Sequence, residues 1–272
     1  KIEEKKMTFT AKIKDSKVVK GIFEAVSSII TETFLDIDPE KGISMVAMDL
    51  SHICLVSLVL AKEDLDEFKA DDKLKIAINL EDFVKIVKRA NPQDEIVFKD
   101  DPEAKRFIIE MKPETAKKAR RFTISMIDID EEKIGPEALE QLEFYNQTTF
   151  KLSYLDEAIK DAEIFSDALE IIADKNLSFS TTGNIGDMTY ELEKDELESS
   201  DFTQKSEGIF GIQFLKNILK ISAVSSKVEM YMATELPIKM VFDILNSSRI
   251  VYYLAPRTEN EDEENEDELY ED

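Results

Sequence analysis

The segment Ile127-Asp-Ile-Asp-Glu-Glu-Lys-Ile-Gly-Pro-Glu-Ala-Leu-Glu-Gln-Leu142 lies at mid-chain, between two halves that repeat one pattern. Each half predicts a strand, a helix, short strands, a second helix with Lys on its polar face, and then further strands. The second helices are the most alike, because Phe83-Val84-Lys85 matches Phe214-Leu215-Lys216. We therefore interpret the segment as a connector between two like α+β domains. The alternative interpretation is two unrelated α+β domains joined by a linker.

The repeat sets the expected domain boundaries. We place the first domain at residues 7–126, the connector at 127–146, the second domain at 147–257 and a tail at 258–272. Domains of this size bury a core of their own. The tail holds ten Asp or Glu and no Lys or Arg, so we expect it to be too acidic to fold alone.

The net charge of −24 argues against a protein that binds phosphates with its whole surface. The tail contributes −10 of this charge, which leaves −14 on the rest of the chain. Cys54 is the only cysteine, so no intrachain disulfide can form. The sequence has no apolar run of about 18 residues and no signal-like segment, and we expect a soluble, intracellular protein with no membrane partner.

The first half predicts two helices with different outer faces. The helix at 17–30 follows a possible cap at Asp15-Ser16, and its apolar stripe predicts packing through one face only. The helix after Asn79 exposes a patch of Lys85, Lys88 and Arg89 that contains no acidic residue. Alternating or apolar runs predict strands at 7–13, 34–38, 42–48, 51–60, 73–78, 95–99, 105–111 and 120–126.

The second half repeats this plan imperfectly. Ser153 is the expected cap of a helix whose polar side is mostly acidic, with Lys160 as its lone cation. The helix at 211–222 turns Lys216 and Lys220 outward, and its polar side holds no acid. Strands are expected at 148–152, 168–173, 177–182, 188–192, 228–232, 238–244 and 250–254, with one more within 191–207.

The chain lacks the signatures of common catalytic sites. It has no Gly-rich phosphate loop, no GxSxG elbow and a single histidine. His52 and Cys54 lie two residues apart at the head of an apolar strand, and we interpret both as packing or surface residues rather than as nucleophile, base or zinc ligand. The acidic run from Asp128 resembles a calcium loop but has Lys133 and Leu139 where such a loop needs Gly and Glu. We expect no metal, no cofactor and no enzymatic activity.

Three separated motifs carry a resemblance to a known family. They are Gly42-Ile-Ser-Met-Val-Ala-Met-Asp-Leu-Ser-His-Ile-Cys-Leu-Val56, Asp128-Ile-Asp-Glu-Glu-Lys-Ile-Gly135 and Tyr252-Tyr-Leu-Ala-Pro-Arg257. With these motifs in order, the chain from Met7 to Arg257 resembles proliferating cell nuclear antigen, the DNA sliding clamp of eukaryotes and archaea. The resemblance implies a ring, usually of three subunits, with helices lining a central hole and antiparallel sheets outside. Such a clamp tethers polymerase to the duplex DNA that it encircles, whatever the sequence of that DNA.

The resemblance also assigns the cations of the helices to DNA. The DNA-facing residues it implies are Lys17, Lys20, Lys85, Lys88, Arg89, Lys160, Lys216 and Lys220. An anionic exterior is compatible with this role, because physiological salt screens charges beyond about 8 Å. The alternative for each cation is an ordinary solvated helix face.

The resemblance further implies an apolar pocket beneath the connector that receives a short peptide motif, the PIP box, ending in paired aromatic residues. The matching positions are Met48, His52, Ile53, Leu55, Ile134, Pro237, Tyr253, Ala255 and Pro256. Each of these alone could equally be a core residue. The family commonly has an apolar residue between the positions of Gly135 and Pro136, and its absence here puts the pocket floor in doubt. DNA polymerase, clamp loader, flap endonuclease and DNA ligase are the partners that the resemblance implies.

Ring closure would join open sheet edges of neighbouring subunits. The resemblance places this joint between the strand at 105–111 and the strand at 188–192, both of which alternate as edge strands do. The residues it implies are Phe107, Ile109, Met111, Met188, Tyr190 and Leu192. We expect a homotrimer, with a heterotrimer of paralogues as the alternative.

Two other classes of function compete with the clamp. One is a metal-dependent nuclease or phosphatase that uses clustered carboxylates. The other is an α+β adaptor protein that never contacts DNA. A clamp would work in the cytoplasm or nucleoid of an archaeon, or in the nucleus of a eukaryote.

Overall fold

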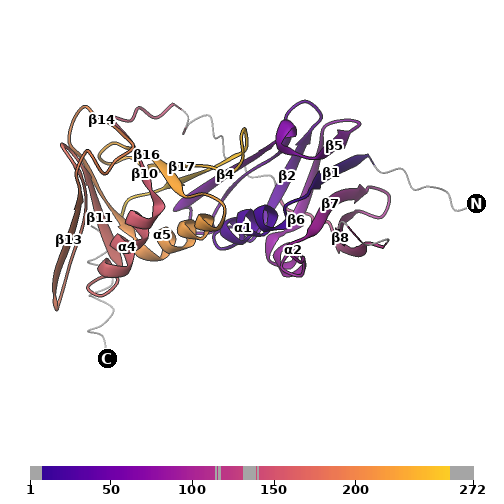
Figure 1. Ribbon diagram of the computed structural model, residues 1–272, viewed down its shortest axis with the longest axis horizontal. Coiled ribbons are helices and arrows are strands. Elements are labelled where there is room, and N and C mark those ends of the chain that lie inside the picture. Colours follow the sequence, from indigo (N-terminus) through magenta and orange to yellow (C-terminus); the bar gives the residue numbers. More distant parts are fainter. Residues whose placement is uncertain (1–7, 114, 116–117, 131–138, 140, 258–272) are drawn as a thin grey trace, which may run out of the picture. The chain divides into compact units, whose positions relative to one another are not determined.

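The computed structural model describes residues 8–113, 115, 118–130, 139 and 141–257, and these form two compact units (Figure 1). Unit 1 takes the described residues of Lys1–Gln141, Asn217–Val228 and Val241–Tyr252. Unit 2 takes those of Leu142–Lys216, Glu229–Met240 and Tyr253–Asp272. The units are therefore not continuous halves of the chain. Within the described ranges, no helix is long and apolar enough to cross a membrane.

Unit 1 combines antiparallel sheets with short helices. Its elements in chain order are β1 (Phe9–Ile13), α1 (Ser16–Ser27), β2 (Glu32–Asp38), β3 (Gly42–Met48), β4 (Cys54–Ala61), the 3-10 helix η1 (Lys62–Asp64), β5 (Glu67–Ala70), β6 (Leu74–Asn79), α2 (Leu80–Val87), β7 (Asp94–Asp101), β8 (Arg106–Pro113), β9 (Arg120–Ser125) and, from the later chain, the 3-10 helix η2 (Leu219–Ala223). One sheet has the order β5-β1-β7-β8-β9. Another run of neighbours is β6-β2-β3-β4, and β4 is followed by β18 (Arg249–Leu254), of which residues 249–252 belong to unit 1.

Unit 2 follows a similar plan. Its elements in chain order are β10 (Asn146–Lys151), α4 (Leu152–Ala162), β11 (Ala168–Ala173), β12 (Leu177–Gly183), β13 (Gly186–Leu192), β14 (Ser199–Phe202), β15 (Ser206–Gly211), α5 (Ile212–Ile218), β16 (Lys227–Met232) and β17 (Ile238–Asp243), of which the last three also extend into unit 1. One sheet has the order β13-β12-β11-β15, and the other strands follow the order β14-β10-β16-β17. Two tandem α+β domains rich in antiparallel sheet were predicted, and this fold class is confirmed.

The helices of unit 1 begin where the sequence predicts. Asp15 caps α1 by accepting a hydrogen bond from Lys17 N, and Asn79 caps α2 by accepting one from Asp82 N. Both helices bury their apolar faces against a cluster of rings, in which the Phe83 centroid lies 4.6 Å from that of Phe23. Phe98 and Phe107 complete this cluster.

The prediction that the first helix packs through one face only is wrong. Gly21 of α1 is buried against η2, and a Cβ atom at this position would lie 2.4 Å from Cγ1 of Val224. Glycine thus permits a close helix approach on a second side of α1, a contact between segments about 200 residues apart that periodicity alone does not reveal.

The helices of unit 2 depart further from prediction. α4 begins at Leu152 and has no side-chain cap, so the expected capping role of Ser153 is wrong. The predicted helix at 211–222 is instead α5 followed by η2. Most predicted strands are present within two or three residues, but the four-residue β5 and most of the glycine-containing β15 were not expected.

One predicted edge strand is an interior strand. β8 lies between β7 and β9, so β9 is the edge of that sheet. Phe107, Ile109 and Met111 on β8 are almost completely buried, because they fill the core beneath α2. β13 lies at the edge of its sheet, as expected for the strand that carries Met188, Tyr190 and Leu192.

Candidate DNA-facing and partner-binding surfaces

The outer face of α2 and the turn directly after it carry three exposed cations. Lys85, Lys88 and Arg89 are exposed because Phe83 and Val87 turn the opposite side of the helix into the core. Lys85 Nζ lies 2.9 Å from Oδ1 of Asp82. The prediction that this patch is free of acidic residues is therefore wrong. The hydrogen bond that Lys85 donates to Asp82 raises the pKa of this ammonium. An exposed pair of this kind contributes little energy, and a phosphate can compete with it.

The two lysines of α1 differ in their surroundings. Lys17 is exposed in the first turn of the helix. Lys20 is half-buried, and its Nζ donates a hydrogen bond to the carbonyl of Ala90, just after α2. Lys20 therefore ties α1 to the C-terminal end of α2, where a cation is favoured. Of the two, Lys17 is the one whose charge faces solvent.

α4 presents the opposite charge. Lys160 Nζ lies 2.5 Å from Oδ2 of Asp156, and the hydrogen bond between them raises the pKa of the lysine. Glu157, Asp161 and Glu163 are exposed on the same helix or directly after it. The only cation predicted here is thus neutralised by its own helix, as its i, i+4 spacing from Asp156 allows.

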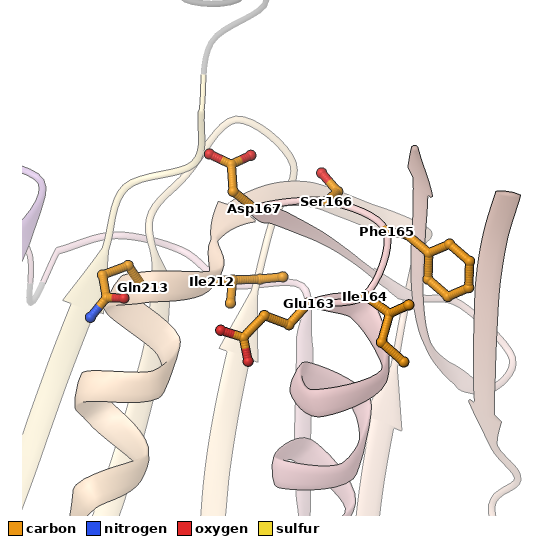
Figure 2. A pocket seen from close by; sticks show the side chains of 7 residues that line it. All are labelled: Glu163, Ile164, Phe165, Ser166, Asp167, Ile212 and Gln213. Atoms are coloured by element: carbon orange, nitrogen blue, oxygen red, sulfur yellow. The ribbon is translucent and has the colours of Figure 1, made fainter. Parts of the chain in front are cut away.

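α5 and η2 hold the last two predicted cations. Lys216 forms an ion pair with Glu163, which lies directly after α4. Glu163 also lines a hollow of about 380 Å³, and Figure 2 shows its side chain directed toward α5. Phe165 points the other way in Figure 2. Lys220 is exposed, and its Nζ donates a hydrogen bond of 3.0 Å to Oδ1 of Asn217. Lys216 is thus neutralised by an acid from another element, a pairing not predicted.

The turn between β3 and β4 holds the pocket residues that belong to unit 1. Met48 and Leu55 are directly opposed across the two strands, with Leu55 buried and Met48 half-buried. The buried carboxylate of Asp49 accepts hydrogen bonds from the backbone N–H groups of Ser51, Ile53 and Cys54, at 2.9, 2.8 and 2.6 Å. These bonds hold the turn in a fixed shape and leave His52 exposed and Ile53 half-buried.

The remaining described pocket residues belong to unit 2. Pro237, Ala255 and Pro256 are half-buried, whereas Tyr253 exposes only 6% of its surface. Arg257 is anchored, because its backbone N–H donates to the carbonyl of Ile209 and its guanidinium donates two hydrogen bonds to the carboxylate of Asp167. Ile134 and Pro136 lie outside the described residues, as do the other residues of 131–138 and residue 140 of the predicted connector.

The geometry gives Cys54 no catalytic role. Its thiol is buried, and desolvation raises its pKa far above the ordinary value, so the nucleophilic thiolate does not form at neutral pH. His52 points into solvent at a positive φ of 58° in the turn. In the part of the chain that the structure describes, no three His, Cys, Asp or Glu residues are grouped to hold a metal ion.

The two sheet edges differ in charge. β9 is exposed at Arg120 and Arg121 and half-buried at Phe122 and Ile124. β13 exposes Asp187 and Glu191 and half-buries Met188 and Tyr190, whereas Leu192 is fully buried. Each edge thus combines an apolar row with charges of a single sign.

Several residues that shape these surfaces were not predicted. Asp49 is indistinguishable in the sequence from other turn carboxylates. β9 alternates visibly, but its edge position depends on strand order. Lys239 lies with its Nζ 4.9 Å from the ring centroid of Tyr231 and 5.7 Å from that of Tyr253. The alternation of β16, β17 and β18 puts these residues on one face, but the strand pairing needed to bring them together is not visible in the sequence.

Comparisons with known proteins cover nearly the whole described chain. Residues 8–133 match the family model of the proliferating cell nuclear antigen N-terminal domain, and residues 138–257 match that of its C-terminal domain. A DNA polymerase sliding clamp from Methanobrevibacter smithii is 30% identical over 93% of this chain and 100% of its own length. One from Methanothermobacter thermautotrophicus is 28% identical over the same shares. Among solved structures, a PCNA2-PCNA3 complex from Sulfolobus tokodaii matches with a TM-score of 0.81 and 22% identity, over 91% of this chain and 99% of that one.

Proposed function

The chain belongs to the proliferating cell nuclear antigen family and is a DNA sliding clamp, and we propose that it encircles duplex DNA as a closed ring of three subunits. A clamp is a processivity factor and performs no chemistry on DNA. The observation that carries the proposal is the basic outer face of α2 on a chain of net charge −24. Cations gathered on one face attract phosphates locally, while carboxylates more than about 8 Å away are screened at physiological salt.

A topological assay tests this proposal. The protein is closed around nicked circular DNA by a clamp loader, and its retention is compared before and after the circle is cut. We expect long retention on the circle and rapid loss after linearisation, because few phosphate contacts would hold the protein on an open end. Light scattering should give about three times the chain mass. Equal retention on both forms would favour an adaptor or an ordinary DNA-binding protein.

The joint between subunits is best supplied by β9 and β13. Both are edge strands, whose free N–H and C=O groups can pair with another chain. The basic residues Arg120 and Arg121 on β9 complement in sign Asp187 and Glu191 on β13. Arg120 already pairs with Asp94, and Arg121 lies 4.0 Å from Glu110, so the joint would have to share these cations. This pairing replaces Phe107, Ile109 and Met111, which the core already uses, by Phe122 and Ile124 as the apolar row of the joint.

We propose that partners bind through a PIP box at the predicted pocket residues. Support comes from the rigid β3–β4 turn, which presents His52 and Ile53, and from Tyr253, Ala255 and Pro256 just before the anchored Arg257. DNA polymerase, clamp loader, flap endonuclease and DNA ligase are the partner classes. The relatives compared are archaeal, which supports action at the nucleoid in the cytoplasm.

Calorimetry with a PIP-box peptide tests the pocket. Ile134→Ala with Tyr253→Ala should weaken binding by about 2 to 4 kcal/mol, a typical cost for removing anchor residues. Tyr253→Phe is the matched control, because it keeps the ring and should bind nearly as the parent does. Thermal unfolding should be followed for each variant, since Tyr253 is largely buried. A double variant that binds as tightly as the parent would exclude this pocket, as would a parent that binds no peptide.

A further inference from the structure

A lysine ammonium lies against two tyrosine rings on one sheet face of unit 2. Lys239 projects from β17, and its Nζ lies 4.9 Å from the centroid of Tyr231 on β16 and 5.7 Å from that of Tyr253 on β18. Both distances fall within the range of cation–π attraction, about 6 Å. β17 is the neighbour of both β16 and β18 in strand order. The two rings therefore restrict where the ammonium can lie.

The surroundings of the rings reinforce this arrangement. Phe144 packs on Tyr231 with a centroid distance of 5.9 Å. Gln147 Nε2 donates to Tyr231 Oη at 3.2 Å and to Glu229 Oε1 at 2.5 Å. Glu229, the neighbouring carboxylate on β16, is thus engaged by an amide, and it forms no ion pair with Lys239.

Lys239 differs in its surroundings from three lysines of the helices. Lys85, Lys160 and Lys216 each have a carboxylate within ion-pair distance. Among the described residues, Lys239 has none. It is half-buried, so its stem is covered and part of its side-chain entropy is already lost. A lysine held in this way loses little additional side-chain entropy when it binds a carboxylate from another molecule.

We propose that Lys239 selects partner peptides that carry an acidic residue beside the aromatic pair of their PIP box. The inference rests on the proposed partner pocket, because Tyr253 would belong to both sites. A peptide whose aromatic residues pack near Tyr253 would bring its flanking side chains toward the ammonium. The carboxylate of Asp or Glu supplies the complementary charge, and electrostatic complementarity of this kind sets specificity more than total affinity.

A calorimetric peptide series tests the proposal. One PIP-box peptide is made with Glu, Gln or Lys at each of the three positions before and after the aromatic pair. With the parent protein, we expect one position where Glu binds about three- to fivefold tighter than Gln, in the range of a partly exposed ion pair. This preference should shrink as salt is raised.

Variants assign the preference to a residue. Lys239→Gln should abolish it, Lys239→Glu should make the Lys peptide the tightest at that position, and Lys239→Arg should keep it. Lys175→Gln is the matched control, since it removes the same charge from an exposed turn of unit 2 and should leave the preference unchanged. Thermal unfolding of each variant shows whether the sheet is intact.

The outcomes separate the two proposals. A parent that binds no peptide overturns the partner pocket itself. A parent that binds all peptides without an acidic preference, or a preference that survives Lys239→Gln, overturns the role of Lys239 and leaves the pocket standing.

Discussion

α2 in unit 1 and α4 in unit 2 bury similar residues and expose opposite charges. The inner face of α2 packs through Phe83 and Val87, and that of α4 through Leu155 and Ile159. The outer face of α2 and the turn after it have three exposed cations, whereas the outer face of α4 is dominated by carboxylates. Packing constrains only the inner side of each helix, so the outer side is free to vary with function. If these helices face DNA as proposed, we expect the attraction for phosphates to be stronger at α2 than at α4.

The largest expected effects are losses of stability when apolar residues are removed from the inner faces of α2 and α4. Phe83→Ala should lower the free energy of unfolding by about 3 to 5 kcal/mol and Leu155→Ala by about 2 to 5 kcal/mol, through lost burial and the cavity left behind. Urea denaturation measures both changes. Lys88→Ala, on the exposed side of α2, should change stability by less than about 0.5 kcal/mol. If Leu155→Ala cost as little as this control, the two inner faces would not be equivalent.

The next largest expected effect is a change in the salt dependence of DNA binding when the cations of each outer face are removed. Each lost phosphate contact should lower the slope of log affinity against log salt by about 0.9. Lys85→Ala with Lys88→Ala and Arg89→Ala should therefore reduce the slope up to three times as much as Lys160→Ala does. Retention of the loaded protein on circular DNA over a range of salt measures both slopes. Similar slopes for the two variants would show that the helices contribute equally.

Removing carboxylates from α4 tests, from the opposite direction, whether the charge of the outer helix face controls DNA binding. Asp156→Asn with Asp161→Asn makes the outer face of α4 less acidic and frees Lys160 from its ion pair. We expect a steeper salt dependence and longer retention on DNA, with the mass of the assembly unchanged. Unchanged retention would place α4 away from the DNA path.

The smallest effect concerns the ion pairs within the helices. Asp82→Asn should lower the pKa of Lys85 toward its ordinary value, and Asp156→Asn should do the same for Lys160, because each lysine loses the hydrogen bond that raises its pKa. Lysine-detected NMR titration measures both. A raised lysine pKa stabilises the fold below the unfolded-state pKa, and this contribution is lost as pH rises through the folded-state pKa. Both lysines are fully exposed, so the stability change should be near the limit of detection.

Two of the three helix caps were readable from the sequence, whereas the cap at Ser153 and the pairing of distant strands were not. The caps of α1 and α2 follow from residues within about one turn, and the structure confirms them. The ion pair of Lys160 with Asp156 was not predicted, although both residues lie on one helix four positions apart. The edge position of β9 depends on which strands pair, so the alternation of β8 was misleading.

Two lysines have partners that are too distant in sequence to be predicted from helix periodicity. Lys20 bonds to the carbonyl of Ala90, which is 70 residues away, and Lys216 pairs with Glu163, which is 53 residues away. Neither partner lies within the window that helix periodicity covers. The family resemblance supplied the candidate sites but not which of their charges are already engaged.

In the proposed ring, the unlike edges β9 and β13 would also set the orientation of the subunits. A joint between a basic edge and an acidic edge is heterologous, so every subunit must follow its neighbour in the same sense around the axis. The two rims of such a closed assembly are then chemically different, since each carries the same elements from all of its subunits. A polymerase bound to one rim would always face the same way along the DNA. The charges of two sheet edges would thereby determine the direction in which the polymerase moves.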